Sequence, residues 1–199
     1  MNTGAARFAA RYPVVWHVIE ADGAGPWLPA TGLLPAASLL RRAGLADHGA
    51  NRDDFLPVAF DGAKAVLRQQ VMPDQRLVPT LAGAFAGQPE SWRRHLNAHV
   101  FFWTEEQRRD AFLRACRRLR SRSVAAPADA APVVVLAFDT AALLAGYGPR
   151  AFFARFNTGS TIRGGARVRR DEATLTSVEE YRAGAVAELA IRSQVMLAM

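Results

Sequence analysis

The irregular order of strand and helix patterns constrains the fold of this chain more than any other feature. Apolar runs typical of strands occur at 12–20, 55–60, 63–68, 100–103, 133–138 and 185–191. Helical patterns separate some of these runs but not others, so the regular alternation of a doubly wound parallel sheet is missing. We therefore predict an α+β fold that forms one domain over residues 1–199, with a flexible N-terminus at 1–11.

Turn and cap signals set the boundaries of most elements. Helices are predicted at 26–34, 35–42, 77–85, 91–98 and 104–120, and after residue 139. Gly32 and Gly44 end the first two, while Thr104 and Asp139 are candidate N-caps. The pair Asp61-Gly62 between two apolar runs predicts a hairpin. The run at 133–138 is the clearest candidate for a buried strand.

The composition favours a soluble cytoplasmic protein. Half of the residues are hydrophobic, which is enough for a substantial core. No run approaches the roughly 20 apolar residues of a membrane span, and no signal-peptide pattern is present. The single cysteine, Cys116, excludes an internal disulfide. The four histidines lack metal-ligand spacing, so we expect no metal site and no membrane partner.

The charge is strongly basic and comes almost wholly from arginine. The formal net charge is +7, and Lys64 is the only lysine. Arginine grips phosphates with a planar fork, and a basic surface favours polyanions. Small basic proteins that never contact nucleic acid share this property. The charge therefore makes nucleic acid a candidate partner. It leaves open the alternative of a basic protein that binds no nucleic acid.

Glu188 and His17 are the first candidates for catalysis. Glu188 interrupts the apolar sequence Val-Ala-Glu-Leu-Ala, where a carboxylate is costly unless it is paired or faces a cleft. The alternative is an edge strand on which Glu188 faces solvent. His17 closes an apolar run, where a histidine that only packs in the core is the alternative. Glu179 and Glu180 compete with Glu188, but their polar surroundings favour a solvated surface.

A polar loop precedes Glu188 in the sequence. Residues 157–163 offer the hydroxyls of Thr158 and Ser160, a glycine between them and the guanidinium of Arg163. Such a loop can cradle a phosphate, or it can be a mobile surface turn. The wider loop at 157–176 carries four arginines that would suit a polyanionic target: Arg163, Arg167, Arg169 and Arg170.

Several short motifs follow one another between Tyr12 and Ile191. They are His17-Val-Ile-Glu20, Gly32-Leu-Leu34, Leu67-Arg-Gln69, Val100-Phe-Phe-Trp103, Phe138-Asp-Thr140 and Asn157-Thr-Gly-Ser-Thr161. Their order resembles one uncharacterised bacterial family, which usually carries Arg-Asp-Gln where this chain has Arg68-Gln-Gln70. More broadly it resembles the ADP-ribosyltransferase-like superfamily, in particular DNA-modifying toxins of the DarT type and tRNA 2'-phosphotransferases.

The resemblance implies a split β-sheet core with peripheral helices and NAD as the cofactor. In such a site the ring of His17 would donate a hydrogen bond to a ribose hydroxyl. Phe102 or Trp103 would stack on nicotinamide, and only one of them can, because neighbours on a strand face opposite ways. Glu188 would drive the transfer by stabilising the positive charge that develops on the ribose.

The resemblance also implies phosphate contacts and an activity. Arg68 or Arg163 would meet the dinucleotide phosphates, beside Thr158 and Ser160. The chain would transfer ADP-ribose to a macromolecular acceptor such as nucleic acid, as a toxin or in phage defence, with an antitoxin as a partner. The alternatives are a non-catalytic module that binds nucleotide or nucleic acid, and an RNA enzyme of the 2'-phosphotransferase kind.

Overall fold

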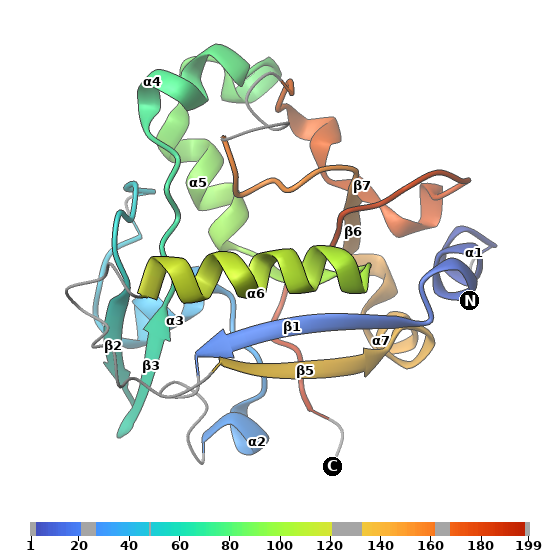
Figure 1. The fold of residues 1–199 in the computed structure, drawn as a ribbon, viewed down its shortest axis with the longest axis horizontal. Coiled ribbons are helices and arrows are strands. Elements are labelled where there is room, and N and C mark those ends of the chain that lie inside the picture. Colours follow the sequence, from blue (N-terminus) through green and yellow to red (C-terminus); the bar gives the residue numbers. More distant parts are fainter. Residues whose placement is uncertain (1–2, 21–26, 48, 121–132, 162–167, 198–199) are drawn as a thin grey trace.

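The computed structural model describes residues 3–20, 27–47, 49–120, 133–161 and 168–197 (Figure 1). They adopt the predicted α+β fold, with a six-stranded sheet in the order β5-β1-β4-β8-β6-β7 and a separate β2–β3 hairpin. The strands are β1 (Val14–Glu20), β2 (Leu56–Phe60), β3 (Ala63–Leu67), β4 (Val100–Trp103), β5 (Val133–Asp139), β6 (Ala151–Ala154), β7 (Thr176–Ser177) and β8 (Glu188–Ile191). The α-helices are α1 (Thr3–Arg11), α2 (Trp27–Thr31), α3 (Ala36–Arg42), α4 (Asp74–Leu77), α5 (Pro89–Asn97), α6 (Glu106–Arg120) and α7 (Thr140–Tyr147).

The large sheet forks between β1 and β4. All of its strand pairs are antiparallel, and β1 pairs with β5 along its whole length, from Val14 opposite Asp139 to Glu20 opposite Val133. The β1–β4 pairing, in contrast, is confined to Trp16 opposite Trp103. Beyond that pair the second half of β1 leaves β4. The fork therefore separates the end of β1 from the start of β4.

The N-terminus is part of the core, which corrects the prediction that residues 1–11 are flexible. Within that segment Thr3–Arg11 form α1, and the side chain of Phe8 is fully buried. Its ring contacts the rings of Tyr12, Phe153 and Tyr181 at centroid distances of 5.1, 6.3 and 5.3 Å. The apolar positions 5, 8 and 9 lie at helical spacing, a signal that the sequence analysis passed over.

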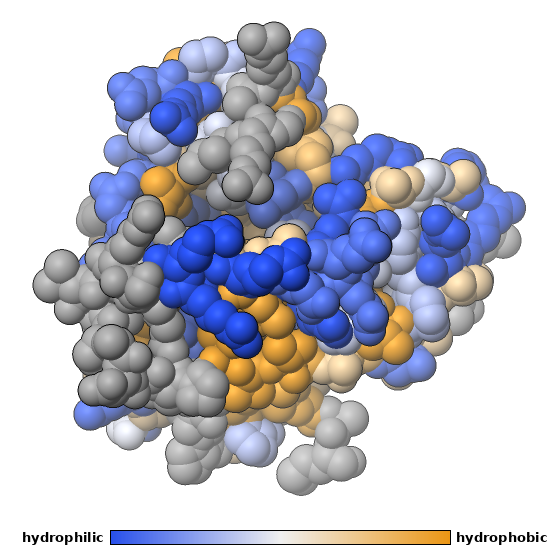
Figure 2. All heavy atoms as spheres, in the orientation of Figure 1, coloured by the Kyte–Doolittle hydropathy of each residue, from blue (hydrophilic) through white to orange (hydrophobic). Residues whose placement is uncertain are grey.

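Strand β5 is an edge strand, although its apolar run predicts burial on both faces. Among the described residues it pairs only with β1, and Val135 is 38% exposed. Figure 2 shows an apolar patch over β1 and β5, below the hydrophilic side chains that follow α6 across this face. An apolar run does not distinguish an edge strand from a central one, because strand pairing is decided elsewhere in the chain.

Local signals in the first half of the chain have mixed outcomes. The hairpin at Asp61-Gly62 is confirmed, and Gly32 and Gly44 end α2 and α3 with positive φ, as predicted. The continuous helix predicted at 77–85 is wrong. Helix α4 ends at Leu77, and two short 3₁₀ turns follow, Val78–Thr80 and Gly83–Phe85.

The two predicted N-caps also differ in outcome. The carboxylate of Asp139 accepts a hydrogen bond from the backbone N–H of Ala142, so it caps α7 as predicted. Thr104 is not a helix cap, because α6 begins two residues later, at Glu106. Its hydroxyl instead donates to the carbonyl of Val186 at 2.6 Å, which ties β4 to the segment before β8.

Helix α6 crosses one face of the sheet in front of β1 (Figure 1). The ring of Phe112 packs on Trp103 at a centroid distance of 5.0 Å, and the guanidinium of Arg109 lies 5.0 Å from the ring centroid of Trp16. The helix thereby covers the point at which β1 and β4 diverge. In the described part of the chain, no helix combines the length and the apolar character needed to cross a membrane.

Candidate functional site

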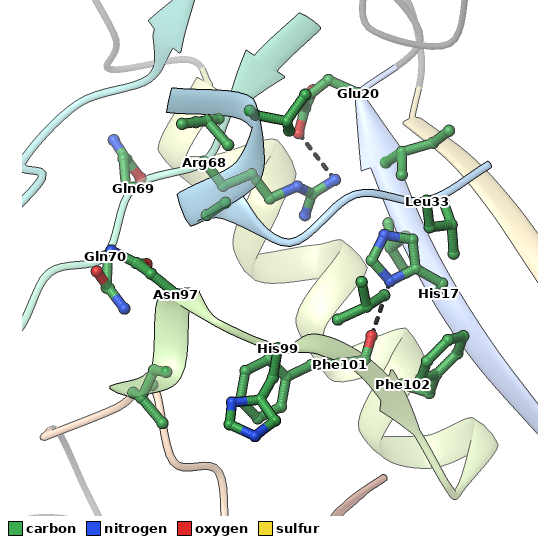
Figure 3. A pocket seen from close by; sticks show the side chains of 18 of the residues that line it. His17, Glu20, Leu33, Arg68, Gln69, Gln70, Asn97, His99, Phe101 and Phe102 are labelled. Atoms are coloured by element: carbon green, nitrogen blue, oxygen red, sulfur yellow. Dashed lines mark hydrogen bonds and ion pairs between the residues drawn. The ribbon is translucent and has the colours of Figure 1, made fainter. Parts of the chain in front are cut away.

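A cavity of about 340 Å³ lies in the fork between β1 and β4, within the size range of small-molecule sites (Figure 3). Its walls include 17–20 of β1, 99–103 at β4, the segment 68–70 after β3 and the loop 157–159. It brings together most of the predicted site residues: His17, Arg68, Phe102, Trp103, Thr158 and Glu188. Residues 171 positions apart in the sequence, 17 and 188, thus share one pocket.

Glu188 begins β8 in the interior of the sheet, between β4 and β6, so the alternative of a solvated edge strand is wrong. The residue is 5% exposed. Its Oε2 accepts hydrogen bonds from the backbone N–H and the hydroxyl of Thr158, at 2.9 and 2.8 Å. Burial raises the pKa of Glu188 to about 7, against the opposing effect of these bonds and of the charge on Arg108. Glu188 is therefore poised between its two forms near neutral pH.

Trp103 is the aromatic residue that lies beside Glu188. In the strand register, Glu188 is opposite Trp103, and Trp103 is opposite Trp16, so the three share one face of the sheet. Phe102 points the other way and is 1% exposed, with its ring against His17 and Phe138. Both Phe102 and Trp103 line the cavity, but half-buried Trp103 has the more accessible ring.

His17 stands at the fork as a neutral hydrogen-bonding group. Its Nδ1 lies 2.7 Å from the carbonyl oxygen of Phe101, which can only accept, so Nδ1 carries the proton. Burial lowers the pKa of His17 to about 4, and the nearby charge of Arg68 acts in the same direction. The ring is then neutral at pH 7, and Nε2 accepts. This reverses the sequence-based expectation that the ring donates to a ribose hydroxyl.

Arg68 lines the cavity, but its charge is already paired. A guanidinium nitrogen lies 2.8 Å from Oε1 of Glu20, a carboxylate with a side chain only 1% exposed. The guanidinium also lies 4.9 Å from the ring centroid of Phe112 and 2.7 Å from Sγ of Cys116. A phosphate at Arg68 would compete with a buried carboxylate. Glu20 was part of a sequence motif, yet its pairing could not be read from spacing.

The loop before Glu188 is only partly a ligand-binding element. Thr158 lines the cavity, whereas Ser160 is outside its lining, and the Ser160 carbonyl accepts from Arg170 at 2.6 Å. Arg170 is fully buried, which corrects its assignment to a polyanion-binding surface. Arg169 is exposed and pairs with Asp171 at 3.1 Å. Arg163 and Arg167, predicted to meet phosphate or polyanion, lie outside the described residues.

The pocket contains a second polar group that sequence analysis did not assign. Arg52 donates to the backbone carbonyl of Arg68 and to Oδ1 of Asn97, at 3.2 and 3.3 Å. Asn97 in turn donates to Asp47 at 3.0 Å. Figure 3 shows Gln69, Gln70 and Asn97 along one edge of the pocket, across from His17 and Phe102. In the sequence, Gln69 and Gln70 were linked to the site only by following Arg68, and Asn97 only by lying shortly before β4.

The remaining candidates are peripheral. Glu179 and Glu180 are exposed in a 3₁₀ turn, Val178–Glu180, in agreement with a solvated surface. Within the described ranges, no group of three or more histidine, cysteine, aspartate or glutamate side chains is arranged to hold a metal ion.

Comparison with known protein families gives one match. A family described as "Family of unknown function (DUF7002)" matches residues 13–198, which include both strands of the fork and every residue of the pocket. Neither the curated proteins nor the solved structures contain a match to this chain.

Proposed function

The chain belongs to the DUF7002 family, whose function is unknown, and we propose that it is an NAD-dependent ADP-ribosyltransferase with Glu188 as a catalytic residue. One observation carries the proposal: a buried glutamate with a pKa near 7 shares a pocket with a neutral histidine and an accessible tryptophan. Strongly perturbed titratable groups that converge in a cleft favour a catalytic role over a purely structural one.

Glu188 has the properties that glycosidic bond cleavage requires. Bound NAD would supply an ADP-ribosyl group on a nicotinamide leaving group, and positive charge develops on the ribose as that bond breaks. A cation beside Glu188 lowers the pKa of its carboxyl and so favours the ionised form. Thr158 fixes Oε2, and Oε1 receives no hydrogen bond from the described residues, which leaves it for a substrate hydroxyl. A fixed carboxylate stabilises the developing charge without reorganisation.

His17 and Trp103 line the same pocket as Glu188, Trp103 on the face of the sheet that carries Glu188 and His17 on the face that carries Phe102. Nε2 of His17 accepts a hydrogen bond from a ribose hydroxyl, since Nδ1 is committed to the carbonyl of Phe101. Trp103 offers an indole face in the same row as Glu188. A cationic pyridinium ring is attracted to such a face. Phe102, held in the core, positions His17.

The forked sheet supports the same assignment. An ADP-ribosyltransferase-like fold implies a split sheet with the dinucleotide in the cleft, and the cavity here lies where β1 leaves β4. Arg68 contributes to this cleft through its pair with Glu20 rather than as a free phosphate ligand.

We assign nucleic acid as the first candidate acceptor, and a toxin or phage-defence role, with an antitoxin, as the context. Arg114 and Arg117 are exposed on α6, the helix that packs on Trp103. Hydrophilic side chains follow this helix across the face seen in Figure 2. Arginines on a helix next to the pocket would hold a phosphate backbone near Glu188.

The test is NAD turnover. The purified protein is incubated with labelled NAD alone and with DNA, RNA or cell lysate, beside Glu188→Gln. Glu180→Gln, an exposed glutamate eight residues away, is the matched control. Release of nicotinamide or transfer of label that is lost in Glu188→Gln and kept in Glu180→Gln supports the proposal. Binding of NAD without turnover under any condition would favour a non-catalytic module, and no binding would exclude the transferase.

A further inference from the structure

The pocket has a second end, before the start of β4, that carries an arginine. Arg52 lines the cavity and is half-buried. Its Nε donates to the carbonyl of Arg68 at 3.2 Å, and its Nη2 donates to Oδ1 of Asn97 at 3.3 Å. Asn97 precedes β4, whereas Glu188 is opposite Trp103, the last residue of that strand. The length of β4, about 10 Å, therefore separates this end of the pocket from Glu188.

The charge of Arg52 is not neutralised by any described carboxylate. In the described part of the chain none lies within ion-pair distance of its guanidinium, and its Nη1 makes no hydrogen bond. Arg68 and Glu20, on the same wall, pair with each other at 2.8 Å. Burial lowers the pKa of Arg52, and the charge of Asp47 offsets this only in part. A partly buried cation without a counter-ion costs free energy, so this end of the pocket favours an anion from outside the chain.

We propose that Arg52 binds the phosphate group of a phosphorylated ligand in this pocket. A guanidinium presents its N–H groups as a planar fork, and that geometry matches the oxygens of a phosphate. The carbonyl of Arg68 and the amide of Asn97 fix the orientation of the fork, which leaves the N–H groups of Nη1 for the ligand. Asn97 donates to Asp47 at 3.0 Å, so the acid holds Arg52 through an amide and does not cancel its charge.

This inference rests on the proposed function, since the phosphate that it assigns to Arg52 is that of NAD. With the reacting bond beside Glu188, the phosphates of a dinucleotide lie further along the same pocket, toward the start of β4. The inference moves the phosphate contact from Arg68, whose charge is paired with Glu20, to Arg52. It adds a reason for the pocket to select a phosphorylated ligand over the free nucleoside.

The test measures the binding of inorganic pyrophosphate by calorimetry, followed by its displacement with NAD. Arg52→Gln removes the charge and the fork, and it should weaken pyrophosphate binding at least about tenfold, the loss expected for a charge-assisted hydrogen bond. Arg52→Lys keeps the charge without the fork and should lose less. Arg76→Gln removes an exposed arginine of α4 and should bind pyrophosphate as the unmodified protein does.

A second measurement needs no variant to fold. Pyrophosphate added to the unmodified protein should shift the NMR resonance of the Arg52 Nε–H and leave that of Arg76 in place. An unshifted Arg52 resonance in the presence of bound pyrophosphate would place the anion elsewhere and overturn the proposal.

The outcomes separate the subsite from the transferase. Absence of pyrophosphate binding, or equal affinity in Arg52→Gln, overturns the subsite. Displacement of pyrophosphate by an oligonucleotide but not by NAD overturns its assignment to the dinucleotide. Displacement by NAD without NAD turnover supports the subsite and excludes the transferase. Turnover of NAD with the same KM in Arg52→Gln overturns the subsite and leaves the transferase standing.

Discussion

Thr158 holds Glu188 through two hydrogen bonds to one oxygen, from its backbone N–H at 2.9 Å and its hydroxyl at 2.8 Å. Both donors stabilise the charged carboxylate, whereas burial disfavours it, and the pKa of about 7 is the balance of the two. The loop before β8 therefore controls the ionisation of Glu188 as well as its position.

Thr158→Val removes the hydroxyl donor and keeps the backbone N–H and the side-chain shape. We expect the pKa of Glu188 to rise further, so that kcat/KM for NAD increases with pH over a higher range than in the unmodified protein. Thr158→Ser keeps the hydroxyl and should restore the original profile. NMR titration of the Glu188 carboxyl carbon gives the pKa independently of activity. An unchanged pKa in Thr158→Val would contradict the balance described above.

Glu188→Gln should stabilise the protein at alkaline pH. The folded pKa of about 7 lies above the ordinary value of 4.5, so the native state holds the proton more tightly than the unfolded state does. The contribution of Glu188 to stability therefore falls as pH rises from about 4.5 through 7, by at most about 3 kcal/mol. The glutamine variant lacks this loss. Urea unfolding at pH 5 and pH 8 measures the pH dependence of stability in the variant and in the unmodified protein. Glu180→Gln should have the same pH dependence as the unmodified protein.

Two histidines should make the fold sensitive to acid. Burial lowers the pKa of His17 and of His99 to about 4 each, from an ordinary 6.5. Between these pH values the unfolded state binds protons at both histidines and the native state does not, so the contribution of the two histidines to stability is present above pH 6.5 and is lost as pH falls toward 4. His99→Gln should flatten this slope, by up to about 3 kcal/mol over the interval. Urea unfolding at pH 4.5 and pH 7 measures how much the free energy of unfolding changes between the two pH values. An equal change in the unmodified protein and in His99→Gln would contradict the prediction.

The Glu20–Arg68 pair should matter more to stability than an exposed pair. Glu20→Gln leaves the guanidinium of Arg68 without its buried partner, and a loss of about 3–5 kcal/mol is expected for a broken pair of this kind. Glu20→Gln/Arg68→Gln should be less destabilised than the sum of the single variants. Asp61→Asn, which breaks the exposed pair with Arg42, should cost at most about 1 kcal/mol. Additive effects at Glu20 and Arg68 would show that the pair is not coupled.

The sequence predicts local structure here better than it predicts long-range contacts. The hairpin at Asp61-Gly62, the cap at Asp139 and strand β4 depend on residues near one another in the chain, and all three are confirmed. The edge position of β5 depends on which strands pair, and apolar content does not encode that. The helix predicted at 77–85 failed because Pro79 and Gly83 divide it into short turns.

The same division applies to the pocket. His17 and Glu188 were recognised because a polar residue in an apolar strand is conspicuous in a sequence. The partner of Glu20 was not predicted, because its pairing with Arg68 depends on how β3 and α6 pack beside β1. Arg170 was misassigned for a related reason, since a guanidinium in a polar loop gives no sign that its partners will bury it.

Helix α1 is the last point at which sequence and structure disagree, and it supports a direct test. Phe8 is fully buried against Tyr12, Phe153 and Tyr181, so Phe8→Ala should lower the free energy of unfolding by about 3–5 kcal/mol. Arg7→Ala changes an exposed neighbour on the same helix and should cost no more than about 0.5 kcal/mol. Chemical denaturation of both variants measures the difference. Equal stabilities would mean that the segment does not pack on the sheet, whereas a large loss confined to Phe8→Ala would establish α1 as part of the core that supports β6 and β8.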